Sequence, residues 1–211
     1  MEEAEAREWL SASNVPRETV QRLEHFILFL RDTNLHHNLI ARSTVNALWS
    51  RHVVDSAQLL TLADDSRGPW LDVGSGAGLP GLVLAILGAE DMTLVEPRRL
   101  RADFLCQAVE KVGLNRSVKV VADRVERMAP GTTPYAVITA RAVAPLPTLF
   151  AAARHLSDPT TIWLLPKGRS AAEELEAARQ SWHGEFRLQP SVTDPAAAIV
   201  VARNVYPRNR R

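Results

Sequence analysis

Apolar runs and amphipathic segments alternate along the chain from about residue 69 to residue 203. Short apolar runs are typical of strands buried on both faces of a parallel sheet, whereas apolar residues at a period near 3.6 predict helices. Strands are expected at 69–73, 92–96, 117–122, 135–140, 160–165, 185–190 and 197–203, and helices at 80–88, 98–113, 144–156 and 170–183. This order predicts an α/β fold with a largely parallel sheet covered on both faces, and an antiparallel pair of final strands at one edge.

The beginning of the chain shows a helical pattern without strands. Apolar residues recur at helical spacing from Val20 to Leu30, and again from Val45 to Leu60. A polar stretch at 64–69 then breaks the pattern. Because the segment before this break is too short to form a good core by itself, we predict that 1–66 is a helical N-terminal extension packed on a domain formed by 67–211.

A loop rich in glycine connects the first expected strand to the helix that follows it. From Asp72 to Gly81 it reads Asp-Val-Gly-Ser-Gly-Ala-Gly-Leu-Pro-Gly. Glycine lacks a Cβ and tolerates positive φ, so such a loop brings bare backbone against a ligand. At the carboxyl end of the first strand of a parallel sheet, that ligand is usually a nucleotide-like cofactor. The alternative is a tight turn that holds no ligand.

Two classes of cofactor fit this loop. Gly76, Gly78 and Gly81 match the spacing with which NAD-dependent enzymes hold a pyrophosphate at a helix N-terminus. The carboxylate of Asp72 would repel a pyrophosphate, whereas it would attract the ammonium group of S-adenosylmethionine, which carries no phosphate. The loop therefore favours S-adenosylmethionine over NAD. With either cofactor, Glu96 at the end of the next expected strand could accept both ribose hydroxyls.

Composition sets limits on the function. The chain has 211 residues, a net charge of +1 and a single cysteine, so it contains no internal disulfide and no cysteine cluster for a metal. That cysteine, Cys106, is expected in the core. No metal site is predicted, because His36-His37 lacks a second pair of ligands. An acidic N-terminus without an apolar signal segment or a membrane span predicts a cytoplasmic protein, and a monomer is favoured.

Charge is distributed unevenly along the chain. Residues 1–66 carry ten acids and six arginines, a net charge of −4, while residues 96–127 carry five acids and eight basic residues, a net charge of +3. Four more arginines and no acid lie in 203–211. Arginine suits phosphate and base contacts, but an ordinary solvated surface explains the same bias. Charge alone does not establish a nucleic-acid partner.

Several polar residues follow the ends of the expected strands, where ligands of open α/β sheets bind. Arg141 follows the fourth strand, where a base or phosphate contact competes with a structural salt bridge. Lys167 follows the fifth strand and suits a functional or a solvated position equally. Asp123 to Glu126 follow the third strand, where they could meet the adenine of a cofactor. An N-cap role of Asp123 at the start of a helix is equally compatible, and both could hold.

The inventory of reactive groups is consistent with a reaction that needs no general base, but does not demand such a reaction. His52 is the nearest candidate for a base, and it lies on the otherwise apolar face of its expected helix. The chain lacks the Asp/Asn-Pro-Pro-aromatic sequence with which enzymes that methylate base amines follow the fourth strand. Guanine N7 carries a free lone pair at neutral pH and can attack a sulfonium methyl group directly. The protein would then need only to align the reactants and exclude water.

Together these segments resemble the bacterial 16S rRNA (guanine-N7) methyltransferases of the RsmG family, also called GidB. The glycine loop preceded by Arg-His-x-x-Asp-Ser is the specific part of the resemblance, whereas the glycine loop alone is not specific. The matching stretches occur in the order of the family and are Asn38-Leu39-Ile40, Arg51-His52-Val53-Val54-Asp55-Ser56, Asp72–Gly81, Arg124-Val125-Glu126, Thr139-Ala140-Arg141-Ala142 and Lys167-Gly168.

The resemblance implies a Rossmann-like, seven-stranded class I methyltransferase sheet with a helical N-terminal extension. It also implies S-adenosyl-L-methionine as the methyl donor and, as partner, a guanine in a loop of 16S rRNA or the small ribosomal subunit. Arg141, Lys167 and His52 are the candidates for the RNA-facing side. The loop, the strand ends and the resemblance together predict eight cofactor-binding residues, which are Gly74, Gly76, Gly78, Leu79, Glu96, Val125, Glu126 and Arg141.

Three other functions stay compatible with the sequence. The first is a small-molecule methyltransferase of the same fold, and the second is an NAD-dependent oxidoreductase. The third is an RNA-binding protein without catalytic activity, against which the intact glycines and acids argue.

Overall fold

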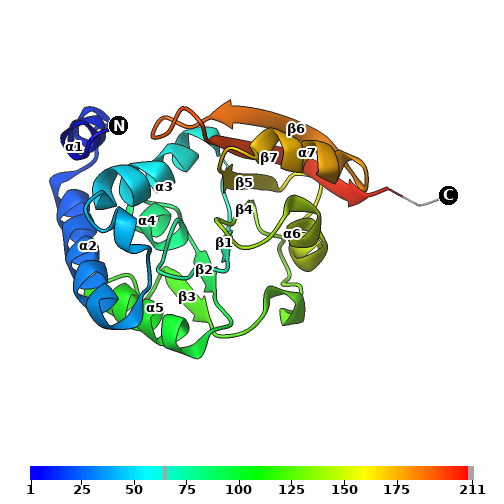
Figure 1. Cartoon of the computed structure of the whole chain (residues 1–211). Coiled ribbons are helices and arrows are strands. Elements are labelled where there is room, and N and C mark those ends of the chain that lie inside the picture. The colour runs from blue at the N-terminus through cyan, green and yellow to red at the C-terminus, as the bar shows by residue number, and fades with distance from the viewer. Residues whose placement is uncertain (64–65, 209–211) are drawn as a thin grey trace.

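One sheet of seven strands forms the centre of the computed structural model, which describes residues 1–63 and 66–208 (Figure 1). Its strands lie in the order β3-β2-β1-β4-β5-β7-β6. They are β1 (Trp70–Val73), β2 (Met92–Val95), β3 (Val118–Val121), β4 (Val137–Thr139), β5 (Ile162–Lys167), β6 (Trp182–Pro190) and β7 (Ala198–Pro207). Strands β1 to β5 are parallel, and β7 is antiparallel to both β5 and β6. The predicted parallel sheet and the antiparallel pair at its edge are confirmed.

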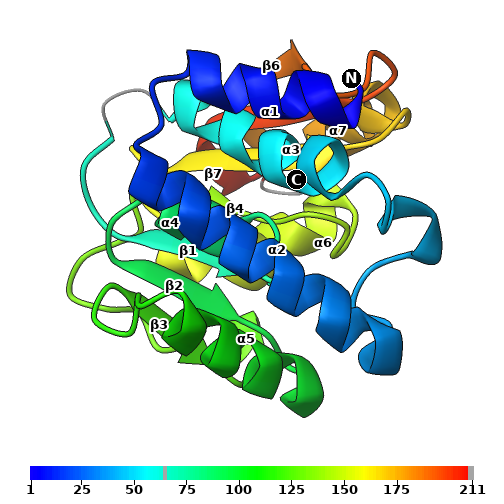
Figure 2. The ribbon, with the colours of Figure 1, turned by 90° about the vertical axis from the view of Figure 1, so that its left-hand side faces the viewer.

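Helices cover both faces of this sheet. They are α1 (Glu3–Ala12), α2 (Arg17–His37), α3 (Asp55–Ala57), α4 (Gly81–Ile86), α5 (Arg99–Lys111), α6 (Leu146–Ala153) and α7 (Ala171–Arg179). Short 3-10 helices lie at Arg42–Thr44, Gln58–Leu62, Val125–Arg127 and Arg154–Leu156. Figures 1 and 2 show α2, α4 and α5 on one face, with α1 beside them, and α6 on the other face.

The strand order places a binding crevice at a definite point. Connections run from β1 through β2 to β3 in one direction, and from β4 to β5 in the other. Because the direction changes between the adjacent strands β1 and β4, the loops that follow these two strands diverge. Open α/β sheets bind their ligands at such a point, beyond the carboxyl ends of the strands.

The helical stretch predicted from Val45 to Leu60 is less regular than expected. A π-helix at Trp49–Val54 continues into α3 and then into the 3-10 helix that ends at Leu62. The carboxylate of Glu3 in α1 accepts hydrogen bonds from the backbone N–H groups of Trp49 (3.2 Å) and Ser50 (2.8 Å). Contacts from a distant helix therefore hold the start of this segment, which the apolar period alone does not show.

The sheet separates two hydrophobic clusters. The larger cluster joins Leu10 of α1 and Phe26 of α2 to the sheet and to Leu84 of α4. The smaller one surrounds Phe150 of α6 and Trp163 of β5.

The prediction that Cys106 lies in the core is wrong, because its side chain is exposed. The buried positions of α5 are Ala102, Phe104, Leu105, Ala108 and Val109. Position 106 falls outside the stripe that these residues form at helical spacing.

Some predictions fall on residues outside the described ranges. Residues 64 and 65 of the predicted break belong there, as do Arg210 and Arg211 of the arginine-rich end. Within residues 1–63 and 66–208, none of the helices has the length and hydrophobicity that crossing a membrane requires. Over the same residues, the side chains form no group of three or more histidines, cysteines or acids suited to a metal ion.

Candidate active site

The glycine loop lies at the carboxyl end of β1 and packs closely against its surroundings. Gly74, Gly76 and Gly78 all have positive φ, at 66°, 54° and 80°. A Cβ on Gly74 would lie 2.6 Å from Cγ2 of Val143, in the loop after β4. Only glycine combines this backbone conformation with so close a contact. The loop after β1 and the loop after β4 therefore touch at the crevice.

The carboxylate of Asp72 serves the fold beneath the loop. Its side chain is fully buried, where Oδ2 accepts the N–H of Gly81 (3.2 Å) and Oδ1 accepts the hydroxyl of Thr139 (2.7 Å). Burial raises the pKa of Asp72 to about 6, although these hydrogen bonds act in the opposite direction. The prediction that this carboxylate faces the ligand is therefore corrected, since both oxygens hold neighbouring elements of the protein.

Glu96 connects the end of β2 to the glycine loop. Its carboxylate is buried, with Oε2 accepting the N–H of Gly76 (2.9 Å) and Oε1 accepting the N–H of Arg98 (2.9 Å). Each carboxylate oxygen has two lone pairs, so each can accept one further hydrogen bond. The role of Glu96 toward a ribose stays a prediction.

The remaining predicted cofactor residues surround this loop at different depths. Leu79 is buried, and Val125 is buried at the start of the 3-10 helix after β3. Glu126, beside it, is exposed. Asp123 accepts the N–H of Arg124 at 2.7 Å, but the residue at the N-cap position of this short helix is Arg124. The prediction that Asp123 caps a helix is therefore wrong.

A cavity of about 670 Å³ lies beyond the ends of β4 and β5, and we call it the β4–β5 cavity. It brings together the three residues predicted for the RNA-facing side, Arg141, Lys167 and His52. Its lining is Thr44, Arg51, His52, Asp55, Arg141, Ala142, Val143, Ala144, Pro145, Pro166, Lys167, Gly168, Glu174, Asp194 and Ala197. Val143 also contacts Gly74, so this cavity adjoins the glycine loop.

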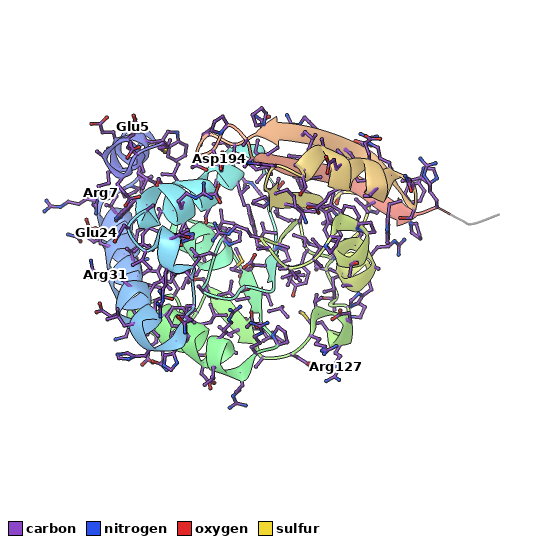
Figure 3. The ribbon with its side chains drawn as sticks, in the orientation of Figure 1. Glu5, Arg7, Glu24, Arg31, Arg127 and Asp194 are labelled. Atoms are coloured by element: carbon purple, nitrogen blue, oxygen red, sulfur yellow. The ribbon has the colours of Figure 1, made fainter. Side chains whose placement is uncertain are left out.

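Each cation that lines the β4–β5 cavity is paired with a carboxylate of the protein. Arg141 lies 2.9 Å from Asp55, Lys167 lies 2.8 Å from Glu174, and Arg51 lies 3.1 Å from Asp194. Asp194, labelled in Figure 3, belongs to the turn between β6 and β7. Three positive and three negative side chains make the lining close to neutral.

Arg141 joins the end of β4 to the N-terminal segment. Its Nη1 donates to Oδ2 of Asp55 and to the carbonyl oxygen of Arg51 (3.2 Å), and its Nη2 lies 3.2 Å from Nδ1 of His52. The structural salt bridge considered for Arg141 is therefore present. The side chain stays 19% exposed at the cavity, so a contact with a ligand is geometrically open to it.

His52 is neutral and has both ring nitrogens in hydrogen bonds. A guanidinium cannot accept, so Nδ1 accepts from Arg141, and Nε2 carries the proton and donates to the hydroxyl of Thr44 at 3.0 Å. Burial and the nearby arginines lower the pKa of His52 to about 3. With no free lone pair on the ring, His52 is not placed to act as a general base.

Sequence reasoning missed the acidic partners of this cavity, apart from Asp55, which lies in one of the matching stretches. Glu174 is in the first turn of α7, where an acid is common in any helix. Asp194 is in a turn, and its partner Arg51 is 143 residues away. No local pattern marks either acid as part of a site.

Comparison with known proteins identifies the family. The sequence model of the rRNA small subunit methyltransferase G (GidB) family matches residues 19–195. The ribosomal RNA small subunit methyltransferase G of Rhizorhabdus wittichii is 49% identical over 213 residues, which cover 100% of this chain and 96% of that protein. The protein of the same name from Zymomonas mobilis is 44% identical and covers 100% and 98%.

The chain belongs to the rRNA small subunit methyltransferase G family. The resemblance stated from the sequence is thereby confirmed. In this family member, three of the stretches that carried the resemblance meet at the β4–β5 cavity, although they are far apart in the sequence. They are Arg51–Ser56, Thr139–Ala142 and Lys167-Gly168.

Solved structures share the fold of this member of the family. A glycopeptide N-methyltransferase, MtfA, complexed with S-adenosyl-L-methionine has a TM-score of 0.60 at 13% identity, covering 72% of this chain and 94% of that one. An O-methyltransferase from Bacillus cereus in complex with SAH has a TM-score of 0.59 at 14% identity, covering 93% and 96%. At such low identity the likeness concerns the fold alone, and it confirms the class I methyltransferase architecture.

Proposed function

We propose that this protein transfers a methyl group from S-adenosylmethionine to N7 of a guanine in 16S rRNA. By the family resemblance, we expect this guanine to be guanine 527 of the small subunit. One observation carries the proposal. The glycine loop expected to hold the donor contacts Val143, which also lines the β4–β5 cavity, so that donor and acceptor sites adjoin at the crevice of the sheet.

The residues around the glycine loop fit S-adenosylmethionine. Gly76 is buried, but apart from its chain neighbours the described atoms within 4 Å of a Cβ added there are Arg101 Nη1 and Gly74 O, at 3.6 and 3.7 Å, so no tight contact fills the space beside it. Glu96 has one free lone pair on each oxygen for the two ribose hydroxyls. The loop from Gly74 to Leu79 would hold the methionine portion, and Val125 with Glu126 the adenine. When bound, this cofactor supplies a methyl group on a positively charged sulfur.

The β4–β5 cavity suits a flat, uncharged base. Its charged groups are internally paired, and Val143, Pro145 and Pro166 add apolar surface. Arg141 and Lys167 present hydrogen-bond donors, which suit the carbonyl oxygen of guanine. A base in a folded RNA would have to leave its stack to enter this cavity.

Among the described residues that line this cavity, His52 has no free lone pair on its ring and each carboxylate is held in an ion pair, which agrees with N7 as the acceptor. As the new carbon–nitrogen bond forms and the carbon–sulfur bond breaks, the nitrogen loses no proton. The protein's contribution would be alignment and exclusion of water, which can supply about 7–11 kcal/mol in favourable cases. His52 then orients Arg141, in keeping with its neutral state.

The proposal is tested by methyl transfer from labelled S-adenosylmethionine to small ribosomal subunits that lack the modification. The RNA is digested and the labelled nucleoside is identified. We expect label in 7-methylguanosine at one position. Label in another nucleoside, or in no RNA while the cofactor binds, would contradict the proposal and leave a small-molecule methyltransferase as the alternative.

A matched pair of glycine variants tests the cofactor site. The measured quantity is the dissociation constant of the cofactor. Gly74→Ala and Gly113→Ala place an alanine at nearly the same φ, 66° and 70°, but only Gly74 has a neighbour within 4 Å of the added Cβ. Both variants carry the backbone strain of about 1–2 kcal/mol. We expect only Gly74→Ala to weaken cofactor binding, by about tenfold. Equal cofactor affinities of the two variants would show that the loop does not form the site.

A further inference from the structure

A second cavity, of about 650 Å³, lies between the C-terminal turn of α2 and the first turn of α5. The two helices lie side by side on the face shown in Figure 2 and are joined by stacked rings of Phe29 and Phe104, with centroids 5.2 Å apart. We call this space the α2–α5 cavity. Its lining is Thr33, His37, Asn38, Leu39, Arg98, Arg99, Leu100, Arg101, Asp103, Phe104 and Gln107.

Positive charge in the α2–α5 cavity is not neutralised. Three arginines face a single acid, Asp103, which pairs with Arg99 at 3.1 Å. Within residues 1–63 and 66–208, neither Arg98 nor Arg101 belongs to an ion pair. The β4–β5 cavity differs in this respect, since each of its cations has a carboxylate partner.

Helix stability does not explain these arginines. The N-terminus of a helix carries partial positive charge, so acids there are favourable and cations are unfavourable. The first turn of α5 contains no acid, and Arg98 and Arg99 stand at its N-cap and first positions. The arrangement costs stability, with Arg98 exposed and Arg101 partly exposed, and a bound anion would compensate this cost.

The α2–α5 cavity adjoins the cofactor loop. Nη1 of Arg101 lies 3.6 Å from the position that a Cβ on Gly76 would take, and the N–H of Arg98 binds the carboxylate of Glu96. These arginines follow β2, while Arg141 follows β4. The two strands flank β1, and two inter-strand spacings place their carboxyl ends about 10 Å apart.

We propose that the α2–α5 cavity binds phosphodiester groups of the substrate RNA, close to the nucleotide whose base enters the β4–β5 cavity. This inference rests on the proposed function. Guanidinium groups match phosphate oxygens with paired N–H donors. In nucleic-acid complexes, phosphate contacts position the nucleic acid and base contacts recognise its sequence. Here the cationic α2–α5 cavity would position the RNA backbone, and the neutral β4–β5 cavity would recognise the base.

The test compares two double variants that remove the same charge. R98A/R101A empties the cavity of its two unpaired arginines. R17A/R116A removes two exposed arginines that also lie outside the ion pairs of the described residues, one at the start of α2 and one ahead of β3. The probe is a 16S rRNA transcript, with its dissociation constant measured over a series of salt concentrations. Cofactor affinity is measured on the same samples.

We expect R98A/R101A to weaken RNA binding about tenfold and to make the negative slope of log affinity against log salt shallower by about 1.4 to 1.8, with cofactor affinity retained. The control should keep the slope of the unchanged protein. Equal slopes in R98A/R101A and the control overturn this inference alone. A loss of cofactor affinity with unchanged RNA binding assigns the arginines to the cofactor and also overturns it. If the unchanged protein neither binds nor methylates the RNA, the proposed function fails first.

Discussion

At the scale of single residues, the carboxylate of Asp72 joins three elements of the fold beneath the glycine loop. It lies in β1, accepts the N–H that begins α4 and the hydroxyl of Thr139 in β4, and is out of contact with water. Ionising a carboxyl group in such a place costs free energy, because the charge is removed from water. The raised pKa of Asp72 therefore results from its burial. The same buried carboxylate holds the end of the glycine loop by accepting the N–H of Gly81.

We expect Asp72 to make stability depend on pH. Its pKa is about 6 in the folded protein and 3.8 in a solvated chain, so the folded state binds the proton more tightly. The stability that this adds is complete below about pH 4 and is lost as the pH rises through 6. Asp72→Asn imitates the protonated form, since its amide can donate to Thr139 while its oxygen accepts from Gly81.

The measurement is urea unfolding of the unchanged protein and Asp72→Asn between pH 4 and 7.5. The unchanged protein should lose roughly 2 kcal/mol relative to the variant between pH 4 and 6, and the difference should level off at about pH 7. A difference that does not vary with pH would show that Asp72 ionises as easily in the folded state as in the unfolded state.

At the scale of elements, the helical segment that contains Asp55 connects three parts of the fold. Oδ2 of Asp55 accepts from Arg141 after β4, and Oδ1 accepts from Thr193 in the β6–β7 turn (2.8 Å) and from Gln58 (3.1 Å). The carboxylate therefore orders the wall of the β4–β5 cavity. An asparagine has one acceptor oxygen in place of two and cannot satisfy all these donors.

Asp55→Asn should destabilise the protein by about 1–3 kcal/mol, because it leaves a partly buried guanidinium or hydroxyl without its acceptor. Asp103→Asn is the matched control, since its pair with Arg99 is largely exposed and such pairs contribute about 0–1 kcal/mol. Urea unfolding at constant pH measures both. Equal effects would mean that the Asp55 contacts add no more than a surface pair does.

At the scale of the whole molecule, the N-terminal helices share a core with the sheet. Leu23, Phe26 and Leu30 of α2 belong to the same hydrophobic cluster as Leu82 of α4 and Leu94 of β2. Phe26 also reaches the glycine loop, where a Cβ on Gly78 would lie 3.3 Å from its ring. Arg7 and Glu24, labelled in Figure 3, form an ion pair between α1 and α2 at 3.6 Å.

This shared core leads us to expect that α2 and the sheet unfold together. Native-state hydrogen exchange in low urea measures the opening free energy of each amide. Amides of Leu23 to Leu30 should converge on the same global value as those of β1. Earlier exchange throughout α2, with β1 still protected, would instead make residues 1–66 a separately opening extension.

The sequence by itself determined the α/β order, the strands within a few residues, the loop from Asp72 to Gly81 and the family. These follow from short-range patterns, because burial on both faces of a strand and positive φ at a glycine are set by near neighbours in the chain. Cys106 is exposed because it lies outside the apolar stripe of α5, although its direct neighbour Leu105 is buried.

Only the tertiary structure decided which charges are neutralised. Arg141 pairs with Asp55 across 86 residues, and Arg51 pairs with Asp194 across 143, whereas the guanidinium groups of Arg98 and Arg101 form no ion pair among the described residues. Ion pairing depends on distance in space and on shielding from water, neither of which a sequence period encodes. The fold therefore determines that one cavity at the edge of the sheet is neutral and the other cationic.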